Sequence, residues 1–371
     1  MSSTGDTPLE TAAPTRARLV DVARVAGVSK ALASRILNGE QLPIRPETRN
    51  RVVVAARGLD YRPHAAARSL KRGETGALSL LIPTLTNPVF ALISRGAVER
   101  ALERDVAVLL IEDSAPARAS ELVSRLVQGG RIDGAMLASV QPEHPLPRTL
   151  ERLRIPHVFV HRTVPGSNRN VSMADQKASA LAVDYLAQLG HRSIAHIAGP
   201  RLLTTTQRLV EGFSARAAEL GLRHVVVGDD FSEPGGAKAA GELFDLRVPP
   251  TAIYTGSLTQ AVGALHVAFE RGLRVPDDFS LIASGELPLA NYLNPPLTSI
   301  SLPLAELGAA AVDALVGQIA GDEPRDVVVE THPEVIVRSS TAPPQDPTGA
   351  DPPAGRARPV PVAVEWHGLI E

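Results

Sequence analysis

The chain has 371 residues, of which 44% are hydrophobic, and it contains no cysteine. This length and apolar content are sufficient for two or three domains with buried cores. The absence of cysteine excludes disulfides, thiolate metal sites and cysteine nucleophiles. No apolar run is long enough to span a bilayer, and residues 1–15 lack the hydrophobic region of a signal peptide, so we expect a cytoplasmic protein.

The charge is distributed unevenly along the chain. Residues 16–72 contain thirteen Lys and Arg against four Asp and Glu, a net charge of +9, whereas the whole chain carries −2. This asymmetry is typical of a small module that contacts phosphates, attached to a larger module that does not.

Residues 18–38 have the pattern of two short helices joined by a tight turn. Two sets of apolar residues recur at helical spacing: Leu19, Val22, Ala23 and Ala26, then Leu32, Ala33, Ile36 and Leu37. Gly27 supplies the left-handed residue that ends a helix, and Ser29 is a favourable N-cap for the next. The spacing alone also fits a helical hairpin in a core, but the basic surroundings favour a helix-turn-helix. A third helix is predicted to begin at Pro46 and to end at Gly58.

Several ordered motifs in this region resemble the LacI/GalR family of transcriptional regulators. They are Asp21-Val22-Ala23, Ala26-Gly27-Val28-Ser29, Ser34-Arg35, Thr48-Arg49, Leu59-Asp60-Tyr61-Arg62-Pro63 and Ala67-Arg68-Ser69-Leu70. The resemblance covers roughly residues 18–342. It implies an N-terminal all-α helix-turn-helix domain with a hinge helix, followed by an α/β two-lobed core like that of type I periplasmic binding proteins.

From Ala77 onward the pattern alternates between strands and helices, which predicts parallel sheets covered on both faces. The predicted strands are 77–82, 106–111, 134–138, 157–161, 193–198, 224–227, 251–255 and 279–283, and the clearest helices are 87–103, 119–128, 177–188 and 259–271. With the resemblance, these elements predict the following organisation: a disordered tail at 1–15, the helix-turn-helix domain at 16–62, hinge helix and linker at 63–75, and the core at 76–341. Within the core, lobe 1 is expected at 76–174 and 301–320, and lobe 2 at 175–300 and 321–341. Residues 342–371 form a Pro-rich C-terminal extension outside the family pattern.

The resemblance implies which residues contact DNA. Helix-turn-helix readers place the first turn of their second helix against base edges in the major groove, and Lys30 and Ala31 occupy the family's main specificity positions. Leu32 replaces the usual Thr, and Arg35 matches a position that often reaches base or backbone. The expected DNA-binding residues are Ser29, Lys30, Ala31, Leu32, Ser34, Arg35, Asn38, Arg49, Arg68, Leu70 and Lys71. For Lys30 and Arg35 the alternative is simple attraction to phosphate.

Residues 63–71 are too short to form a stable helix alone in water. In the resembled family this segment is a hinge helix that folds on operator DNA, where Leu70 would act as an apolar wedge in the minor groove beside Lys71. The alternative is a linker with an incidental helical turn.

The resemblance also implies an effector site between the two lobes. The expected contacts are Asn87, Phe90, Arg162, Gln176, Arg208, Phe213, Gln260 and Glu286. Four polar positions usual in the family are missing or shifted: Leu209 for Arg, with Arg208 one place earlier, Leu258 and Gly285 for Asp, and His161 for an acidic residue. Buried sugar hydroxyls need polar partners. We therefore hypothesise a less polar or differently arranged ligand, or none, and each polar candidate also fits an ordinary surface or interlobe position.

These patterns favour a homodimeric, DNA-binding regulator, most often a repressor in this family, that binds a pseudo-palindromic operator and responds to a small molecule. The alternative is a regulator with a diverged cleft that responds to a protein partner or to no effector. We find no Walker A loop, GxSxG elbow or HExxH motif, and we expect no enzymatic activity, metal or cofactor.

Overall fold

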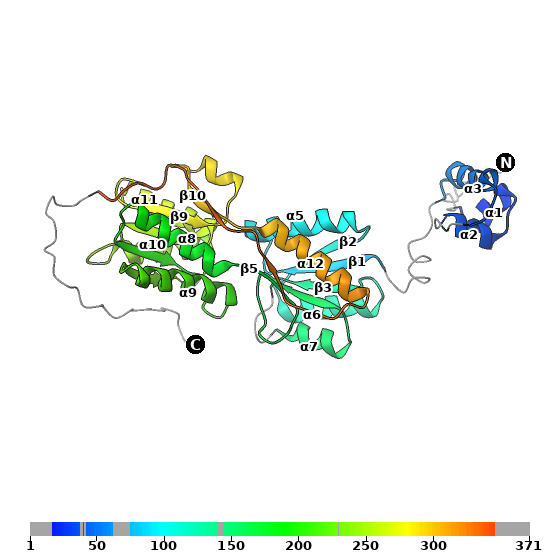
Figure 1. The fold of residues 1–371 in the computed structure, drawn as a ribbon, viewed down its shortest axis with the longest axis horizontal. Helices are drawn as coiled ribbons and strands as arrows, with labels where there is room; N and C mark the ends of the chain where they lie inside the picture. Colours follow the sequence, from blue (N-terminus) through cyan, green and yellow to red (C-terminus); the bar gives the residue numbers. More distant parts are fainter. Residues whose placement is uncertain are drawn as a thin grey trace, which may run out of the picture. The chain divides into compact units, whose positions relative to one another are not determined.

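The computed structural model describes residues 17–37, 40, 42–61, 75–139, 144–228 and 230–345. The chain divides into two compact units, Met1–Thr75 and Gly76–Glu371. Each unit is described by itself (Figure 1).

The described part of the N-terminal unit contains three helices, α1 (Leu19–Ala26), α2 (Lys30–Leu37) and α3 (Pro46–Gly58). Gly27 adopts a left-handed conformation with φ 65°, and it ends α1 as predicted. The core of this unit is small and is formed by buried side chains from all three helices: Val22, Ala23, Ala26, Ala33, Ile36, Val52, Ala55 and Ala56. The short side chains of the four alanines that α1 and α3 contribute allow these helices to approach closely.

The second unit contains two six-stranded sheets, each of which forms one lobe. In lobe 1 the strand order is β11-β5-β4-β3-β1-β2, and in lobe 2 it is β12-β10-β9-β8-β6-β7. The strands of lobe 1 are β1 (Ala77–Ile82), β2 (Ala107–Glu112), β3 (Gly134–Leu137), β4 (His157–Val160), β5 (Asn170–Met173) and β11 (Val327–Val329). The strands of lobe 2 are β6 (Ser193–Ile197), β7 (Arg223–Val227), β8 (Ala252–Thr255), β9 (Ser280–Ser284), β10 (Thr298–Ser301) and β12 (Glu334–Ile336).

Helices cover the faces of both sheets. Those that pack on lobe 1 are α5 (Pro88–Glu103), α6 (Pro116–Gln128), α7 (Pro145–Arg152) and α12 (Leu304–Ile319). Those that pack on lobe 2 are α8 (Asp175–Gln188), α9 (Thr204–Glu219), α10 (Glu233–Phe244) and α11 (Leu258–Glu270), together with the short 3-10 helix η1 (Pro288–Tyr292). All sheet pairings are parallel except that of β12 with β10. The eight predicted strands are therefore present, with ends that differ by at most one residue.

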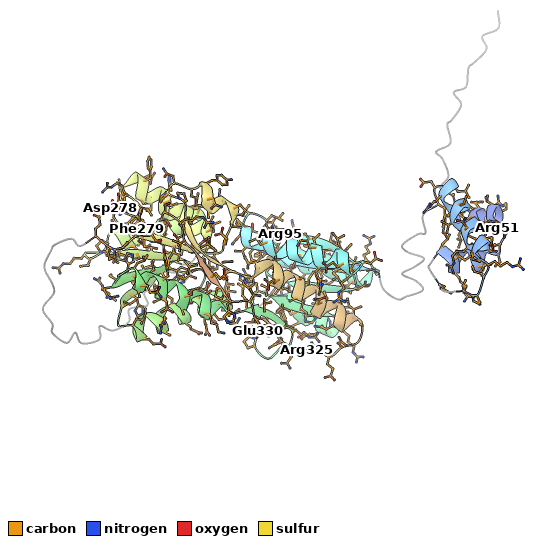
Figure 2. The ribbon with its side chains drawn as sticks, turned by 45° about the horizontal axis from the view of Figure 1, so that its top comes forward. Arg51, Arg95, Asp278, Phe279, Arg325 and Glu330 are labelled. Carbon is orange, nitrogen blue, oxygen red and sulfur yellow. The ribbon has the colours of Figure 1, made fainter. Side chains whose placement is uncertain are left out.

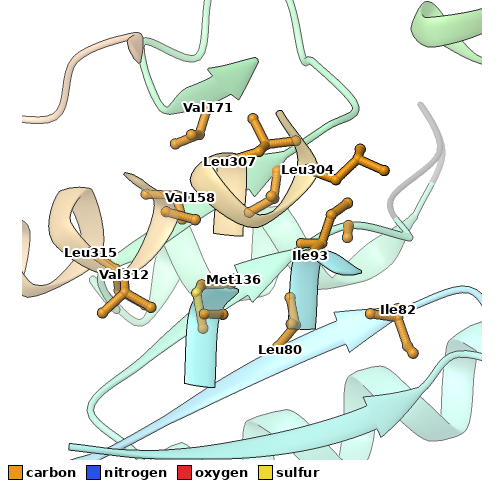
Figure 3. Close-up of a cluster of buried hydrophobic side chains, with 14 of the residues drawn as sticks. Leu80, Ile82, Ile93, Met136, Val158, Val171, Leu304, Leu307, Val312 and Leu315 are labelled. Atoms are coloured by element: carbon orange, nitrogen blue, oxygen red, sulfur yellow. The ribbon is translucent and has the colours of Figure 1, made fainter. Parts of the chain in front are cut away.

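Lobe 1 is held together by an apolar layer between its sheet and the helix pair α5 and α12 (Figure 3). Leu80 and Met136 from the sheet contact this layer, as do Leu307 and Leu315 from α12. Although α12 lies about two hundred residues after α5 in the chain, the two helices lie side by side (Figure 1). This pairing returns the chain from lobe 2 to lobe 1.

The structure corrects the predicted lobe boundary in residues 321–341. We expected this whole stretch in lobe 2, but β11 pairs with β5 in the sheet of lobe 1, and only β12 belongs to lobe 2. Sequence patterns did not predict β5, β10, β11 and β12, which are short strands of three or four residues. A strand this short has no clear hydrophobic periodicity of its own.

The expected start of the C-terminal extension at residue 342 is also too early. The carbonyl oxygen of Ala342 accepts hydrogen bonds from His191 Nε2 (3.0 Å) and Ser280 Oγ (2.9 Å), which tie this residue to lobe 2. Among the described residues no helix is long and apolar enough to cross a membrane.

Candidate nucleic-acid interface and interlobe cavity

The first turn of α2 is exposed, as a base-reading turn requires. Ser29 Oγ accepts a hydrogen bond from the backbone N–H of Leu32 (3.1 Å), so the predicted N-cap is confirmed. Lys30 and Ala31 follow directly, and both are exposed to solvent. These two side chains therefore lie outside the core of the N-terminal unit.

The side chain of the next residue, Leu32, contacts the core of the N-terminal unit. It is half-buried and packs against the core of the N-terminal unit, so it supports the helices rather than extending from them. We predicted Leu32 among the DNA-contacting residues, and that contact stays a prediction for this half-buried side chain. An apolar side chain in place of the family's usual Thr is explained by this burial.

Arg35 and Arg49 converge on Glu40. Arg35 Nε donates to Glu40 Oε2 (2.7 Å), while Arg49 Nη2 donates to the carbonyl oxygen of Glu40 (3.1 Å). The Arg35 side chain remains about half exposed, and an exposed pair of this kind contributes at most about 1 kcal/mol to stability. Arg35 can therefore exchange Glu40 for a phosphate or a base, whereas Arg49 positions the segment after α2.

The start of α1 has an arginine where the family commonly has a Thr N-cap. Here Arg18 makes no side-chain cap, but Asp21 Oδ2 accepts a hydrogen bond from the Arg18 backbone N–H (3.0 Å). Asp21 Oδ1 also accepts from Arg24 Nη2 (2.8 Å). One carboxylate thus stabilises the first turn.

Basic side chains surround these elements. The exposed cations of the described part of this unit are Arg18, Arg24, Lys30, Arg35, Arg45, Arg51 and Arg57, and Figure 2 shows Arg51 on the outside of α3. Ser34 is half-buried on α2. The expected contacts Asn38, Arg68, Leu70 and Lys71 lie outside the described residues.

Between the two lobes of the second unit lies a cavity of about 210 Å³. Lobe 1 contributes Pro83, Thr84, Asn87, Val89, Phe90, His161 and Arg162 to its walls. Lobe 2 contributes Asp175, Pro200, Leu203, Thr205, Leu209, Asp230, Phe231, Gly256, Ser257 and Ser284, and Leu302 comes from the segment that crosses between the lobes. Eight of these eighteen side chains are aliphatic, aromatic or proline, so a large part of the wall is apolar.

Three of the expected effector contacts line this cavity. Asn87 caps α5, since its Oδ1 accepts a hydrogen bond from Val89 N (3.1 Å), and Phe90 lies one turn further along the same helix. Arg162 Nη1 donates to the carbonyl oxygen of Ser139 (2.6 Å). Burial lowers the pKa of Arg162 to about 10.

The other five are not among the residues that line this cavity. Gln176 Nε2 donates to Glu211 (2.8 Å), and Gln260 Nε2 donates to the carbonyl oxygen of Ala198 (2.8 Å). The ring of Phe213 is fully buried in the core of lobe 2.

Glu286 and Arg208 have partners as well. Glu286 forms a bidentate ion pair with Arg338 (2.6 and 3.0 Å) and is not among the residues that line the cavity. Arg208 Nη2 donates to Thr163 Oγ1 (3.1 Å), and its Nη1 lies 3.7 Å from Asp175 Oδ2. Arg208 is thus adjacent to the cavity without being part of its wall.

Two polar groups in the wall were absent from the expected contacts. Asp175 is only 2% exposed, and within the part of the chain that the structure describes its Oδ2 has no hydrogen-bond partner. Burial raises the pKa of Asp175 to about 7, although Arg208 opposes this shift. His161 follows β4 with φ 68°, and burial lowers the pKa of its imidazole to about 3, so the ring is neutral.

The aromatic residue Phe231 was also missed, because it lies in a loop without periodicity. Cβ atoms placed on Gly199 and Gly256 would come within 2.2 and 3.1 Å of its ring. These two glycines follow the ends of β6 and β8, and they leave the space that the ring occupies. Glycines after neighbouring parallel strands were the only signal that could have indicated this arrangement.

Behind Arg162 lies a buried polar cluster formed by Asp113, Ser139 and His144. Asp113 Oδ2 accepts from Ser139 Oγ (2.6 Å) and contacts His144 Nε2 (3.0 Å), while His144 Nδ1 accepts from Leu146 N (3.2 Å). Because Ser139 also holds Arg162 through its carbonyl oxygen, this cluster fixes the arginine at the cavity wall.

A helix-turn-helix whose second helix begins with an exposed turn in basic surroundings, joined to a two-lobed α/β core, defines a class of DNA-binding regulators. Comparison with known proteins agrees. Residues 18–64 match the family model of bacterial regulatory proteins of the lacI family, and residues 183–341 match the periplasmic binding protein-like domain.

Two relatives and one solved complex show how far the likeness extends. The HTH-type transcriptional repressor CytR of Escherichia coli is 31% identical over 339 residues, which cover 88% of this chain and 97% of that repressor. The crystal structure of a LacI family transcriptional regulator from Mycobacterium smegmatis is 35% identical, with a TM-score of 0.68 over 72% of this chain and all of that chain. The lac repressor dimer bound to operator and the anti-inducer ONPF is 22% identical, and it shares the fold with a TM-score of 0.77 over 88% of this chain and all of that chain. The chain belongs to the LacI family and is a DNA-binding transcriptional repressor.

Proposed function

We propose that the protein acts as a homodimer on a pseudo-palindromic operator, and that a small molecule in the interlobe cavity modulates its affinity for DNA. The observation that carries this proposal is the pairing of an exposed reading turn, Lys30-Ala31, with a cavity of about 210 Å³ in a separate unit. A cavity with a buried carboxylate favours a small-molecule effector over regulation by a protein partner alone.

The dimer is argued from contact area and from exposed apolar residues. One reading helix offers too little contact for specific binding, and two-fold symmetry supplies a second half-site. On lobe 1, the edge strand β2 exposes Leu109 and Leu110, and α5 exposes Leu102. On lobe 2, Phe269 and Tyr292 are each more than four-fifths exposed. Exposed apolar side chains of this size are typical of protein interfaces, and we assign them to the dimer contact.

Lys30 can donate to guanine O6 or N7, and the Ala31 methyl group can pack on a thymine methyl. Each good base contact contributes about 1–3 kcal/mol of discrimination. Arg35 and the surrounding cations supply the phosphate contacts that orient the unit on the duplex.

The test begins with selection of the full-length protein against randomised duplexes, followed by affinity measurements on the selected and a scrambled duplex at several salt concentrations. We expect a pseudo-palindrome with a deformable central step, bound at least about a thousandfold more tightly than the scrambled duplex. Leu70→Ala should weaken specific binding by about tenfold or more, because the apolar wedge is lost, while non-specific binding stays nearly unchanged.

Leu70→Met, which keeps an apolar side chain of similar size, is the matched control and should retain most of the specific affinity. An equal loss on both duplexes for Leu70→Ala would exclude the minor-groove role. Equal and steeply salt-dependent binding of the wild type to both duplexes would contradict sequence-specific recognition itself.

A further inference from the structure

The cavity wall contains one buried acid whose charge is poorly compensated. Asp175 is the first residue of α8, and its Oδ2 has no hydrogen-bond partner among the described residues. Its nearest cation is Arg208, whose Nη1 lies 3.7 Å away and therefore beyond hydrogen-bonding distance. An ionised carboxylate in such a place requires a partner, and Asp175 is one of the residues that line the cavity.

The other charged groups in the cavity wall do not compensate the negative charge of Asp175. Arg162 lies in the wall, but it is held by Ser139 and faces the buried carboxylate of Asp113 behind it. His161 is neutral, because burial lowers its pKa far below the neutral range. Asp230 adds a second negative charge to the wall. Within the described residues, the lining therefore carries two carboxylates against one guanidinium.

The remaining wall suits a hydrocarbon body. Phe90 from lobe 1 and Phe231 from lobe 2 both line the cavity, together with Leu203 and Leu209. Leu209 stands where the resembled family usually has an arginine that would hold a sugar. The faces of aromatic rings also attract organic cations.

We propose that the cavity binds an apolar organic amine, whose ammonium group pairs with Asp175 and whose hydrocarbon body packs against Phe90 and Phe231. This inference rests on the proposed function, since it names the class of effector for the same cavity. A cavity volume of about 210 Å³ suits a small molecule such as an aromatic ring with a short chain. The raised pKa of Asp175, about 7, agrees with a site whose charge Arg208 compensates only in part.

The same carboxylate is placed to transmit binding between the lobes. Arg208, its nearest cation, donates to Thr163 Oγ1 on lobe 1 (3.1 Å). The backbone N–H of Thr163 in turn donates to Thr204 Oγ1 on lobe 2 (3.0 Å). An ammonium group at Asp175 competes with Arg208 for the carboxylate, so binding alters a contact that spans both lobes.

The test uses titration calorimetry on the full-length protein at about pH 8, where the carboxylate is ionised. The probes are benzylamine, 2-phenylethylamine and tryptamine, each with its alcohol counterpart, benzyl alcohol, 2-phenylethanol and tryptophol. Glucose, ribose and sucrose complete the panel. We expect at least one amine to bind about tenfold or more tightly than its alcohol, because a charge-assisted pair is formed only with the amine.

Two variants separate recognition from structure. Asp175→Asn should abolish the preference for the amine, whereas Asp184→Asn, the same substitution on the same helix at a residue paired with Arg216 outside the cavity, should retain it. Thermal unfolding of both variants establishes that they are folded.

Each outcome decides the proposal. Preference for the amine that is lost in Asp175→Asn and kept in Asp184→Asn supports it. Equal binding of amines and alcohols, tight binding of any of the sugars, or no binding of any amine overturns it. Operator affinity measured on the same samples keeps the two proposals distinct, because sequence-specific DNA binding without amine binding would remove only the ligand assignment.

Discussion

At the scale of single residues, the most informative side chain is Asp175. It is almost completely buried, its Oδ2 has no hydrogen-bond partner among the described residues, and it lies at the first position of a helix whose N-terminus favours negative charge. The helix N-terminus and Arg208 both favour the charged form of Asp175. Burial nevertheless outweighs them and raises the pKa of Asp175 to about 7. The surrounding fold keeps Asp175 buried, and the folded state is less stable when its carboxylate is charged than when it is protonated.

This predicts a pH-dependent effect of Asp175→Asn in the absence of ligand. The folded chain binds a proton at Asp175 up to about pH 7, whereas the unfolded chain releases it above the ordinary value of 3.8. The acid therefore lowers stability as pH rises through this window. We expect the variant to exceed the wild type in free energy of unfolding by up to about 4 kcal/mol near pH 8, with the difference vanishing near pH 4.

Urea unfolding at several pH values measures this difference. Asp184→Asn is the control, since its carboxylate pairs with Arg216 near the surface, and it should show no gain at high pH. A constant offset between Asp175→Asn and the wild type at all pH values would contradict the raised pKa.

At the scale of elements, the pairing of α5 with α12 depends on two glycines. A Cβ on Gly96 would lie 1.9 Å from the carbonyl oxygen of Ala305, and one on Gly308 would lie 2.0 Å from that of Ile93. In both cases the obstacle is backbone, which cannot move aside without separating the helices. Glycine disfavours a helix by about 1 kcal/mol relative to alanine, so close packing must outweigh that loss here.

Gly96→Ala should therefore lower the free energy of unfolding of lobe 1 by about 2 kcal/mol or more, since overpacking exceeds the gain in helix propensity. Gly241→Ala on α10 is the matched control, because its Cβ would meet only the flexible guanidinium of Arg271 at 3.3 Å. We expect that control to stay within about 1 kcal/mol of the wild type. Denaturant unfolding followed by circular dichroism compares the two, and equal effects would show that the helix crossing tolerates a methyl group.

At the scale of the whole molecule, the second unit contains a set of neutral histidines, of which His157, His191 and His196 are buried and His161 is half-buried. Burial lowers the pKa of His157, His161, His191 and His196, to about 3 for His161 and about 4 for His196. Hydrogen bonds hold several of them in place, for example His191 Nδ1 to Thr251 Oγ1 (2.9 Å). These histidines serve the core of the unit in their uncharged form.

The direction in which these histidines change the stability of the folded unit with pH follows from the linkage between proton binding and folding. Below the ordinary value of 6.5 the unfolded chain takes up protons that the folded unit does not, so stability is lost as pH falls from 6.5 toward 4. Asp175 acts in the opposite sense over part of this range, but it is one group against four. We expect the melting temperature of the second unit to fall progressively below about pH 6.5.

Thermal unfolding between neutral and acidic pH measures this trend. His266→Gln, which replaces an exposed histidine on α11, should leave the dependence unchanged. A melting temperature that stays constant down to about pH 4.5 would contradict the role of the buried histidines.

Many of the helices and strands follow from local sequence patterns, because the interactions that form them act over a few residues. The helical spacing in 18–38, the left-handed Gly27 and the Ser29 cap predict the reading turn, and the structure confirms them. The buried strand Ala77–Ile82 is likewise predicted to the residue. Family motifs extend this to the class of protein, since ordered residues at matching separations are specific.

Only the tertiary structure decides how distant segments share a site. It places β11 beside β5, more than a hundred and fifty residues earlier in the chain, because parallel pairing completes the sheet of lobe 1. It removes Gln176, Gln260 and Phe213 from the expected cavity wall, since each finds its partner in lobe 2. It also places the buried Asp175 in the cavity wall without a hydrogen-bond partner for its Oδ2 among the described residues. Hydrophobic periodicity indicates which face of an element is buried, but the partner of a polar side chain is set by contacts between segments distant in sequence, which no local pattern encodes.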